Sequence, residues 1–135
     1  MIMSGEIGEQ IAMNEKKEKV FYVTTHSGDD PERASVPFTL GKAALAMDID
    51  ATIFLHGNGV WLATKGYAKH VRAEPFESIE KLMESFLELG GKLLVCVPCL
   101  QARNIDEAEL IEGVELAAAG RVTEEMFTAQ VHLVF

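Results

Sequence analysis

The sequence predicts an α/β fold, a doubly wound three-layer sandwich with about five mostly parallel strands and helices on both faces. Strand-like runs alternate with helical patterns from residue 19 to the end of the chain, and this alternation is typical of parallel sheets. The first of these runs, residues 20–25, contains no charged residue, as expected of a strand that is buried on both faces. With 135 residues, 48% of them hydrophobic, the chain can bury a substantial core in one domain.

The first strand and the first helix are marked by composition and by a capping signal. Residues 20–25 are β-branched or aromatic throughout and predict a buried strand. Asp30 and Pro31 suit the N-cap and the first position of a helix that we expect to end near Met47. Pro37 lies inside this helix and is expected to kink or restart it, because proline cannot donate a helical hydrogen bond.

The later elements follow from periodicity and turn residues. We expect a strand at 51–55, a short helix at 60–68, a helix at 76–89, a strand at 92–97, a short helix capped by Asp106, a strand at 113–117, a helix capped by Thr123 and a last strand at 131–135. Residues 1–18 are polar and show no period. They are expected to form a flexible arm, which leaves 19–135 as the folded domain.

Charge and hydropathy exclude several classes of protein. The formal net charge is −9, so a direct nucleic-acid binder, which needs a basic face, is not expected. The same charge disfavours anionic membrane surfaces. No apolar run approaches the ~20 residues that a membrane span needs, and the N-terminal segment lacks the apolar core of a signal peptide. We therefore expect a cytoplasmic protein without a membrane partner.

Cys96 and Cys99 form a Cys-x-x-Cys pair at the end of a predicted strand. In a cytoplasmic chain this spacing points to metal or redox chemistry rather than to a structural disulfide. A cysteine just before a helix is placed where free amides favour the thiolate, and Arg103 can add positive charge. The alternative is that Cys96 is simply a small buried apolar residue.

Cofactor and metal sites are not expected. The glycines around Asn58 do not form a dinucleotide-binding fingerprint, and the segment 28–42 is not a phosphate-binding loop. One cysteine pair supplies only two ligands, and neither His26 nor His56 has ligand-like spacing to it. Open α/β sheets nevertheless bind ligands at the carboxyl ends of their strands. His26, His56 and Cys96 are all expected at that edge.

Three segments resemble the DsrE/DsrF-like family. They are Gly-Asp-Asp-Pro-Glu-Arg-Ala at 28–34, Phe-Leu-His-Gly-Asn-Gly-Val-Trp-Leu at 54–62, and Cys-Val-Pro-Cys-Leu-Gln-Ala-Arg at 96–103. The resemblance covers roughly residues 19–135. It implies a doubly wound, flavodoxin-like fold, assembly into homotrimers or hexamers, and for some members a relay of sulfur as a cysteine persulfide.

The resemblance also implies roles for single residues. Cys96 matches the sulfur-carrying cysteine, because Arg103 then falls at the expected distance, and Cys99 matches a second cysteine that only some members have. Asn104 stands where glycine is common. Asparagine tolerates the left-handed backbone conformation that glycine would serve there.

The leading hypothesis is a sulfur-carrier protein that exchanges sulfane sulfur with donor and acceptor proteins. His26, Asn58 and Trp61 would shape the pocket of the two cysteines, although a sole tryptophan more often anchors a core or an interface. If the chain is active, a sulfurtransferase-like reaction is expected. The alternatives are a thiol–disulfide redox protein and a non-catalytic oligomeric binding module with buried cysteines.

Overall fold

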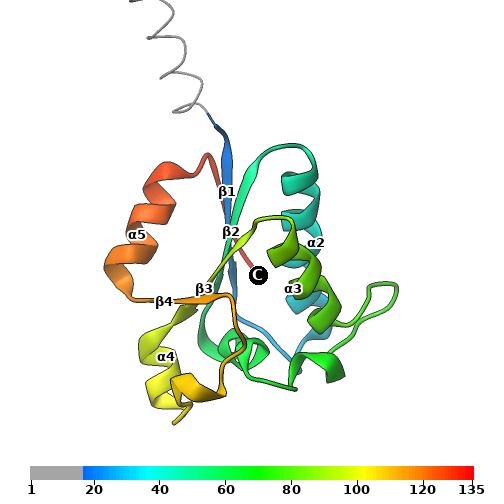
Figure 1. Ribbon diagram of the computed structural model, residues 1–135, viewed down its shortest axis with the longest axis vertical. Helices are drawn as coiled ribbons and strands as arrows, with labels where there is room; N and C mark the ends of the chain where they lie inside the picture. Colours follow the sequence, from blue (N-terminus) through cyan, green and yellow to red (C-terminus); the bar gives the residue numbers. More distant parts are fainter. Residues whose placement is uncertain (1–16) are drawn as a thin grey trace, which may run out of the picture.

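In the computed structural model, which describes residues 17–135, a five-stranded parallel sheet lies between two layers of helices (Figure 1). The strands are β1 (Lys19–Thr24), β2 (Asp50–Leu55), β3 (Lys92–Cys96), β4 (Val114–Ala117) and β5 (Val131–Val134). Their order is β4-β3-β2-β1-β5, and all neighbours are parallel. The predicted sandwich is confirmed. Its first four strands are neighbours in chain order, unlike the 2-1-3-4-5 order of flavodoxin itself.

Helices cover both faces of the sheet. The helices α2 (Pro31–Ala46) and α3 (Ile79–Glu88) lie on one face, and α5 (Ala119–Thr128) lies on the other (Figure 1). The short helix α4 (Val97–Ala102) begins directly after β3, and 3₁₀ helices occupy other connections: η1 (Gly57–Ala63), η2 (Ala68–His70) and η3 (Glu107–Glu109). Between residues 17 and 135, no helix is long and apolar enough to cross a membrane. The arm predicted at 1–18 falls, except for its last two residues, outside the described residues and stays a prediction.

Local signals place the start of α2 correctly. The carboxylate of Asp30 accepts a hydrogen bond from the backbone N–H of Arg33 at 3.1 Å, and Pro31 occupies the first helical position. The helix runs on through Pro37 without restarting there. Pro37 and the following Phe38 are both buried, so tertiary packing holds the helix together where proline removes one of its backbone hydrogen bonds.

The start of α5 differs from the prediction. Thr123 was expected to cap this helix, but α5 begins four residues earlier at Ala119, and the Thr123 hydroxyl donates to the Ala119 carbonyl oxygen at 2.7 Å. The helix begins there because β4 ends at Ala117, only two residues before it. The start of the helix is therefore set by this short connection and not by a capping side chain.

Aromatic side chains fill the space between the sheet and the layer of α2 and α3. The rings of Phe38 and Phe86 meet edge to face with centroids 6.0 Å apart, a geometry that aromatic pairs prefer. A Cβ atom at Gly41 would lie 2.8 Å from the Phe86 ring, and one at Gly91 would lie 2.4 Å from it. Glycine at these two positions therefore lets α2 and the start of β3 approach the ring closely.

A buried carboxylate attaches α5 to the opposite face of the sheet. The side chain of Glu125 is only 4% exposed and lies 2.6 Å from the Lys19 ammonium and 2.5 Å from the Arg121 guanidinium. It also accepts a hydrogen bond from Thr52 in β2 at 3.2 Å. Burial alone would raise the pKa of Glu125, but hydrogen bonds and charges from Lys19 and Arg121 outweigh it, and the pKa lies below its usual range. The carboxylate thus links α5 to β1 and β2 as a fully partnered ion.

The close approach of η1 to β1 yields a stability prediction. A Cβ at Gly59 would lie 2.1 Å from the carbonyl oxygen of Thr24, so Gly59→Ala is expected to lower the free energy of unfolding by about 2 kcal/mol or more. Gly120→Ala in α5 is the matched control, because a Cβ there meets nothing within 4 Å. Urea denaturation measures both. Equal stability of the two variants would contradict the packing described for Gly59.

Candidate functional site

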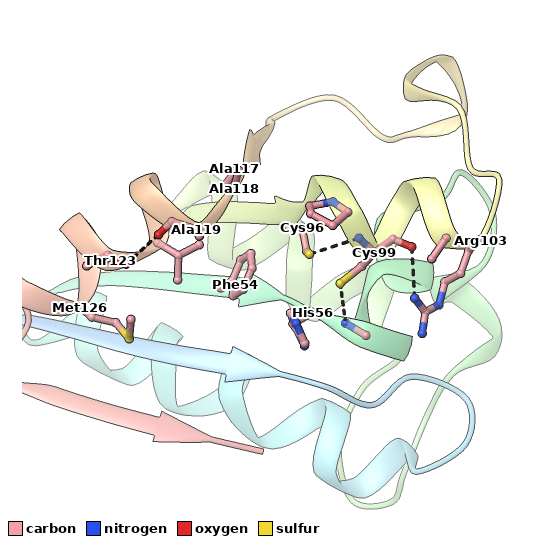
Figure 2. A pocket seen from close by; sticks show the side chains of 14 residues that line it. Phe54, His56, Cys96, Cys99, Arg103, Ala117, Ala118, Ala119, Thr123 and Met126 are labelled. Carbon is pink, nitrogen blue, oxygen red and sulfur yellow. Dashed lines mark hydrogen bonds between the residues drawn. The ribbon is translucent and has the colours of Figure 1, made fainter.

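The two cysteines lie at the carboxyl edge of the sheet, where β3 ends and α4 begins (Figure 2). In the register of the parallel strands, Leu55 of β2 pairs with Val95 of β3. The next residues along the two strands, His56 and Cys96, therefore emerge side by side. Cys99 follows in the first turn of α4. Adjacent strand ends and a helix start bring the three side chains to one place.

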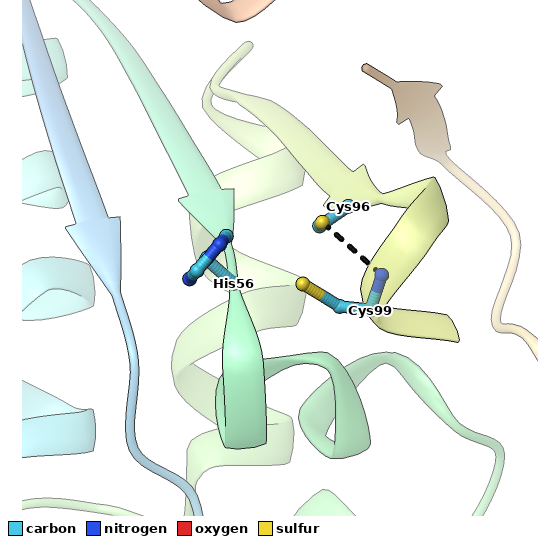
Figure 3. Close-up of side chains that lie close together, drawn as sticks. All are labelled: His56, Cys96 and Cys99. Atoms are coloured by element: carbon cyan, nitrogen blue, oxygen red, sulfur yellow. Dashed lines mark hydrogen bonds between the residues drawn. The ribbon is translucent and has the colours of Figure 1, made fainter. Parts of the chain in front are cut away.

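These three side chains form a compact group (Figure 3). The Sγ atoms of Cys96 and Cys99 and a ring nitrogen of His56 all lie within 4.8 Å of one another. Both cysteines are free and nearly buried, at 6% and 9% exposure, whereas His56 is exposed. The imidazole lies at a tilt against the ring of Phe54, with centroids 5.7 Å apart. His56 was expected from the sequence at this edge of the sheet but not as a residue of the site.

Each sulfur accepts a hydrogen bond from a backbone N–H. Cys96 is the N-cap of α4, and its Sγ accepts from the N–H of Cys99 at 3.3 Å. The Sγ of Cys99 accepts from the N–H of Gly57 at 3.3 Å. Gly57 has a positive φ of 56°, a conformation that glycine adopts without steric cost. The backbone therefore orients both sulfurs.

The protonation state of Cys96 differs from the one expected from its position. Burial raises the pKa of Cys96 to about 11, and the neighbouring Cys99 side chain adds to this effect. The N–H of Cys99 and the charge of Arg103 lower the pKa only in part. The helix α4 has six residues, and Pro98 in its first turn lacks an N–H. Burial therefore raises the pKa of Cys96 by more than the start of the helix lowers it, and Cys96 is a thiol at neutral pH.

Arg103 joins α4 to the loop after β2. Its guanidinium donates to the carbonyl oxygen of Cys99 at 3.1 Å and to Oδ1 of Asn58 at 3.2 Å. Asn58 and Arg103, both taken as site residues from the sequence, therefore contact each other beside the cysteines. The next residue, Asn104, adopts a φ of 53°, which confirms the left-handed conformation expected there.

The cysteines open into a pocket of about 610 Å³ between α4 and α5 (Figure 2). Most of its wall is apolar, and it includes Phe54, Pro98, Ala117, Ala119, Val122 and Met126. His56, Arg103 and Thr123 provide polar atoms. The sequence did not predict that α5 forms one wall of the pocket. The one sequence feature that indicates this wall is the run of small residues at 117–119, which leaves room beside the cysteines.

Two residues expected in this pocket lie elsewhere. Trp61 stacks on Tyr67 with ring centroids 6.2 Å apart and lines a separate hollow that also includes His70. His26 lies at the end of β1, where its Nδ1 is 2.7 Å from a carboxylate oxygen of Asp29. Neither side chain lines the pocket of the cysteines. The structure therefore places His26 and Trp61 away from this pocket. His26 follows β1, and Trp61 lies within η1. Asn58, the third residue expected to shape it, contacts Arg103 but does not line the pocket either.

Solved structures support the fold. The chain is similar to the YchN protein from E. coli, with a TM-score of 0.69 and 17% identity, covering 88% of this chain and 99% of that one. It is equally similar to MTH1491 from Methanobacterium thermoautotrophicum, a protein of unknown function, with a TM-score of 0.69, 14% identity, and coverage of 87% of this chain and 99% of that one. At these identities the likeness concerns the fold alone.

Sequence relatives and a family model establish the membership. The chain is 33% identical over 119 residues to the uncharacterized protein MJ0760 of Methanocaldococcus jannaschii, which is 88% of this chain but only 43% of that protein. It is 35% identical over 101 residues to MJ0989, another uncharacterized protein of the same organism, or 73% of this chain and 83% of that one. The family model matches residues 18–135. The chain therefore belongs to the DsrE/DsrF-like family.

Proposed function

We propose that this chain is a sulfur carrier, which accepts sulfane sulfur as a persulfide on Cys96 and passes it to an acceptor thiol. Membership of the DsrE/DsrF-like family suggests a function of the sulfur-relay type. The observation that supports persulfide transfer at Cys96 is the pair of free cysteines, which opens into a largely apolar pocket of about 610 Å³. Such a pocket can admit a donor's persulfide and then shield the product from bulk solvent.

The transfer involves one sulfur atom and no net oxidation. The thiolate of Cys96 attacks the outer sulfur of the donor persulfide, a new S–S bond forms at Cys96, and the donor cysteine leaves as a thiolate. The proton of Cys96 passes to solvent or to the departing thiolate. Delivery repeats the exchange in the other direction, because an acceptor thiolate attacks the outer sulfur and Cys96 is the leaving group.

A thiol–disulfide redox role is the second candidate. It is favoured by the separation of the two Sγ atoms, which is no more than 4.8 Å and which a small movement could close to the ~2.05 Å of a disulfide. In that role the Cys99 thiolate would attack the inner sulfur of a Cys96 persulfide, form the Cys96–Cys99 disulfide and release HS⁻. A structural role for two buried thiols is the third candidate, supported by their low exposure.

The first prediction for this function concerns mass after sulfur loading. After incubation with a desulfurase and cysteine, the wild-type chain is expected to gain about 32 Da, one sulfur atom, which a reductant removes. Cys96→Ala is expected to abolish the gain, since the attacking atom is lost. Cys99→Ala is the matched control, removing the neighbouring thiol while leaving Cys96 in place. Intact-mass spectrometry measures all three.

Other outcomes of the same measurement decide against the carrier role of Cys96. Loading of Cys96→Ala but not of Cys99→Ala would assign the sulfur to Cys99. A loss of about 2 Da in the wild type, without a sulfur adduct, would indicate a disulfide and the redox role. A separate alkylation experiment, in which the two thiols react only after denaturation, would select the structural role.

A second prediction concerns pH. Because burial raises the pKa of Cys96 to about 11, its thiolate fraction should rise about tenfold for each pH unit between pH 7 and 10. The rate of carboxamidomethylation at Cys96, followed by peptide mass spectrometry in the wild type, should rise with the same slope. A rate that levels off below pH 9 would show that the thiol ionises more easily than its burial implies.

A third prediction concerns assembly. Proteins of the family are known to be oligomeric, and we propose a homotrimer or hexamer for this chain. The edge strand β5 and helix α5 expose large apolar side chains, with Phe127 87% and Val134 71% exposed. Burial of such a patch favours association. Light scattering at micromolar concentration should give three or six times the 14.8 kDa chain mass.

The variant Phe127→Asp tests whether the apolar surface of α5 and β5 forms the subunit interface. A charge at this position should reduce the oligomer mass, because it would be buried without a partner in the interface. Leu89→Asp is the matched control, since Leu89 is 52% exposed at the end of α3, on the opposite face of the sheet. A monomeric wild type would refute the proposal of an oligomer.

A further inference from the structure

We infer that His56, Cys96 and Cys99 form a three-ligand site for Zn²⁺, with the fourth position open to the pocket. Their ligand atoms lie within 4.8 Å of one another. The sequence predicts His56 and Cys96 at the same edge of the sheet, but it does not predict that their ligand atoms meet, because His56 is distant from the cysteines along the chain. The inference concerns metal binding and stands independently of the proposed sulfur transfer.

The backbone places the ligands before any metal arrives. His56 follows β2, Cys96 ends β3, and the two strands are paired in register through Leu55 and Val95. Cys99 lies one helical turn beyond Cys96. Small side-chain rotations can bring three such atoms to the ~2.0–2.3 Å distances of zinc–nitrogen and zinc–sulfur bonds. Ligands on rigid elements need little reorganisation.

The surroundings of the two sulfurs suit metal-bound thiolates. Each Sγ accepts one backbone N–H, from Cys99 and from Gly57, at 3.3 Å. These donors stabilise negative charge on sulfur and orient it, as outer-shell hydrogen bonds do at metal centres. The Phe54 ring supports the imidazole of His56 from the pocket wall. Each sulfur retains lone pairs that can bind a metal ion.

The donor set selects the metal and leaves one position free. Two thiolates and one imidazole suit a tetrahedral, thiophilic cation such as Zn²⁺. Three protein ligands with an open fourth position are characteristic of zinc sites that hold water or substrate. The pocket of about 610 Å³ that reaches the cysteines has room for that fourth ligand. Binding releases the two thiol protons to solvent and occupies both sulfurs.

The test uses Co²⁺ as a spectroscopic substitute for Zn²⁺ on the reduced full-length chain. We expect one Co²⁺ per chain, with thiolate-to-cobalt charge-transfer absorption and the intense visible bands of a tetrahedral site. Added Zn²⁺ should displace the cobalt and remove both signals. His56→Gln should weaken Zn²⁺ binding by at least about tenfold, since loss of even an outer-shell partner costs ~10–100-fold in affinity.

His26→Gln is the matched control, because His26 also follows a strand of the sheet but is paired with Asp29. It should bind cobalt and zinc like the wild type. A wild type without charge-transfer absorption at equimolar Co²⁺ overturns the inference, and so does a His56→Gln variant that binds Zn²⁺ as tightly as the wild type. His56 is exposed, so the variant should keep the wild-type melting temperature. It also keeps both thiols, and its sulfur loading can be measured separately.

Discussion

The parallel pairing of β2 with β3 is the constraint on which the site depends. Its register places Leu55 beside Val95, so the next residues, His56 and Cys96, leave the sheet together at its carboxyl edge. A shift of the pairing by one residue would send each side chain to the other face and separate the imidazole from the sulfur. The core that holds this register is made of side chains buried on both faces of the sheet, among them Ile53 and Leu94.

Burial and reactivity are opposed at Cys96. The same packing that fixes the side chain also raises the pKa of its thiol to about 11, which lowers the fraction of the nucleophilic form. The hydrogen bond from Cys99 N–H and the charge of Arg103 oppose this effect only in part. A resting thiol in an apolar pocket is protected from adventitious oxidation. Its ionisation then depends on what enters the pocket, whether a donor protein or a metal ion.

Sulfur transfer and zinc binding would use the same atoms and would therefore exclude each other. Both require the thiolates of the cysteine pair, one as nucleophile and the other as ligand. His56 distinguishes the two chemistries, because the persulfide exchange proceeds through the sulfurs while the metal site needs the imidazole as its third ligand. Sulfur transfer and zinc binding would both take place beside the pocket wall that α5 forms. The buried ion Glu125 holds this helix against β1 and β2.

Local features of this protein could be determined from the sequence alone. The cap at Asp30, the cysteine pair at a strand end and the left-handed Asn104 each depend on neighbours within a few residues, as does the α/β alternation. Only the tertiary structure decided four other features. They are the start of α5, the separation of Trp61 from the cysteines, the position of His56 beside them and the raised pKa of Cys96. Each depends on strand order, register or burial, which arise from contacts between residues far apart in the chain. No local pattern records those contacts.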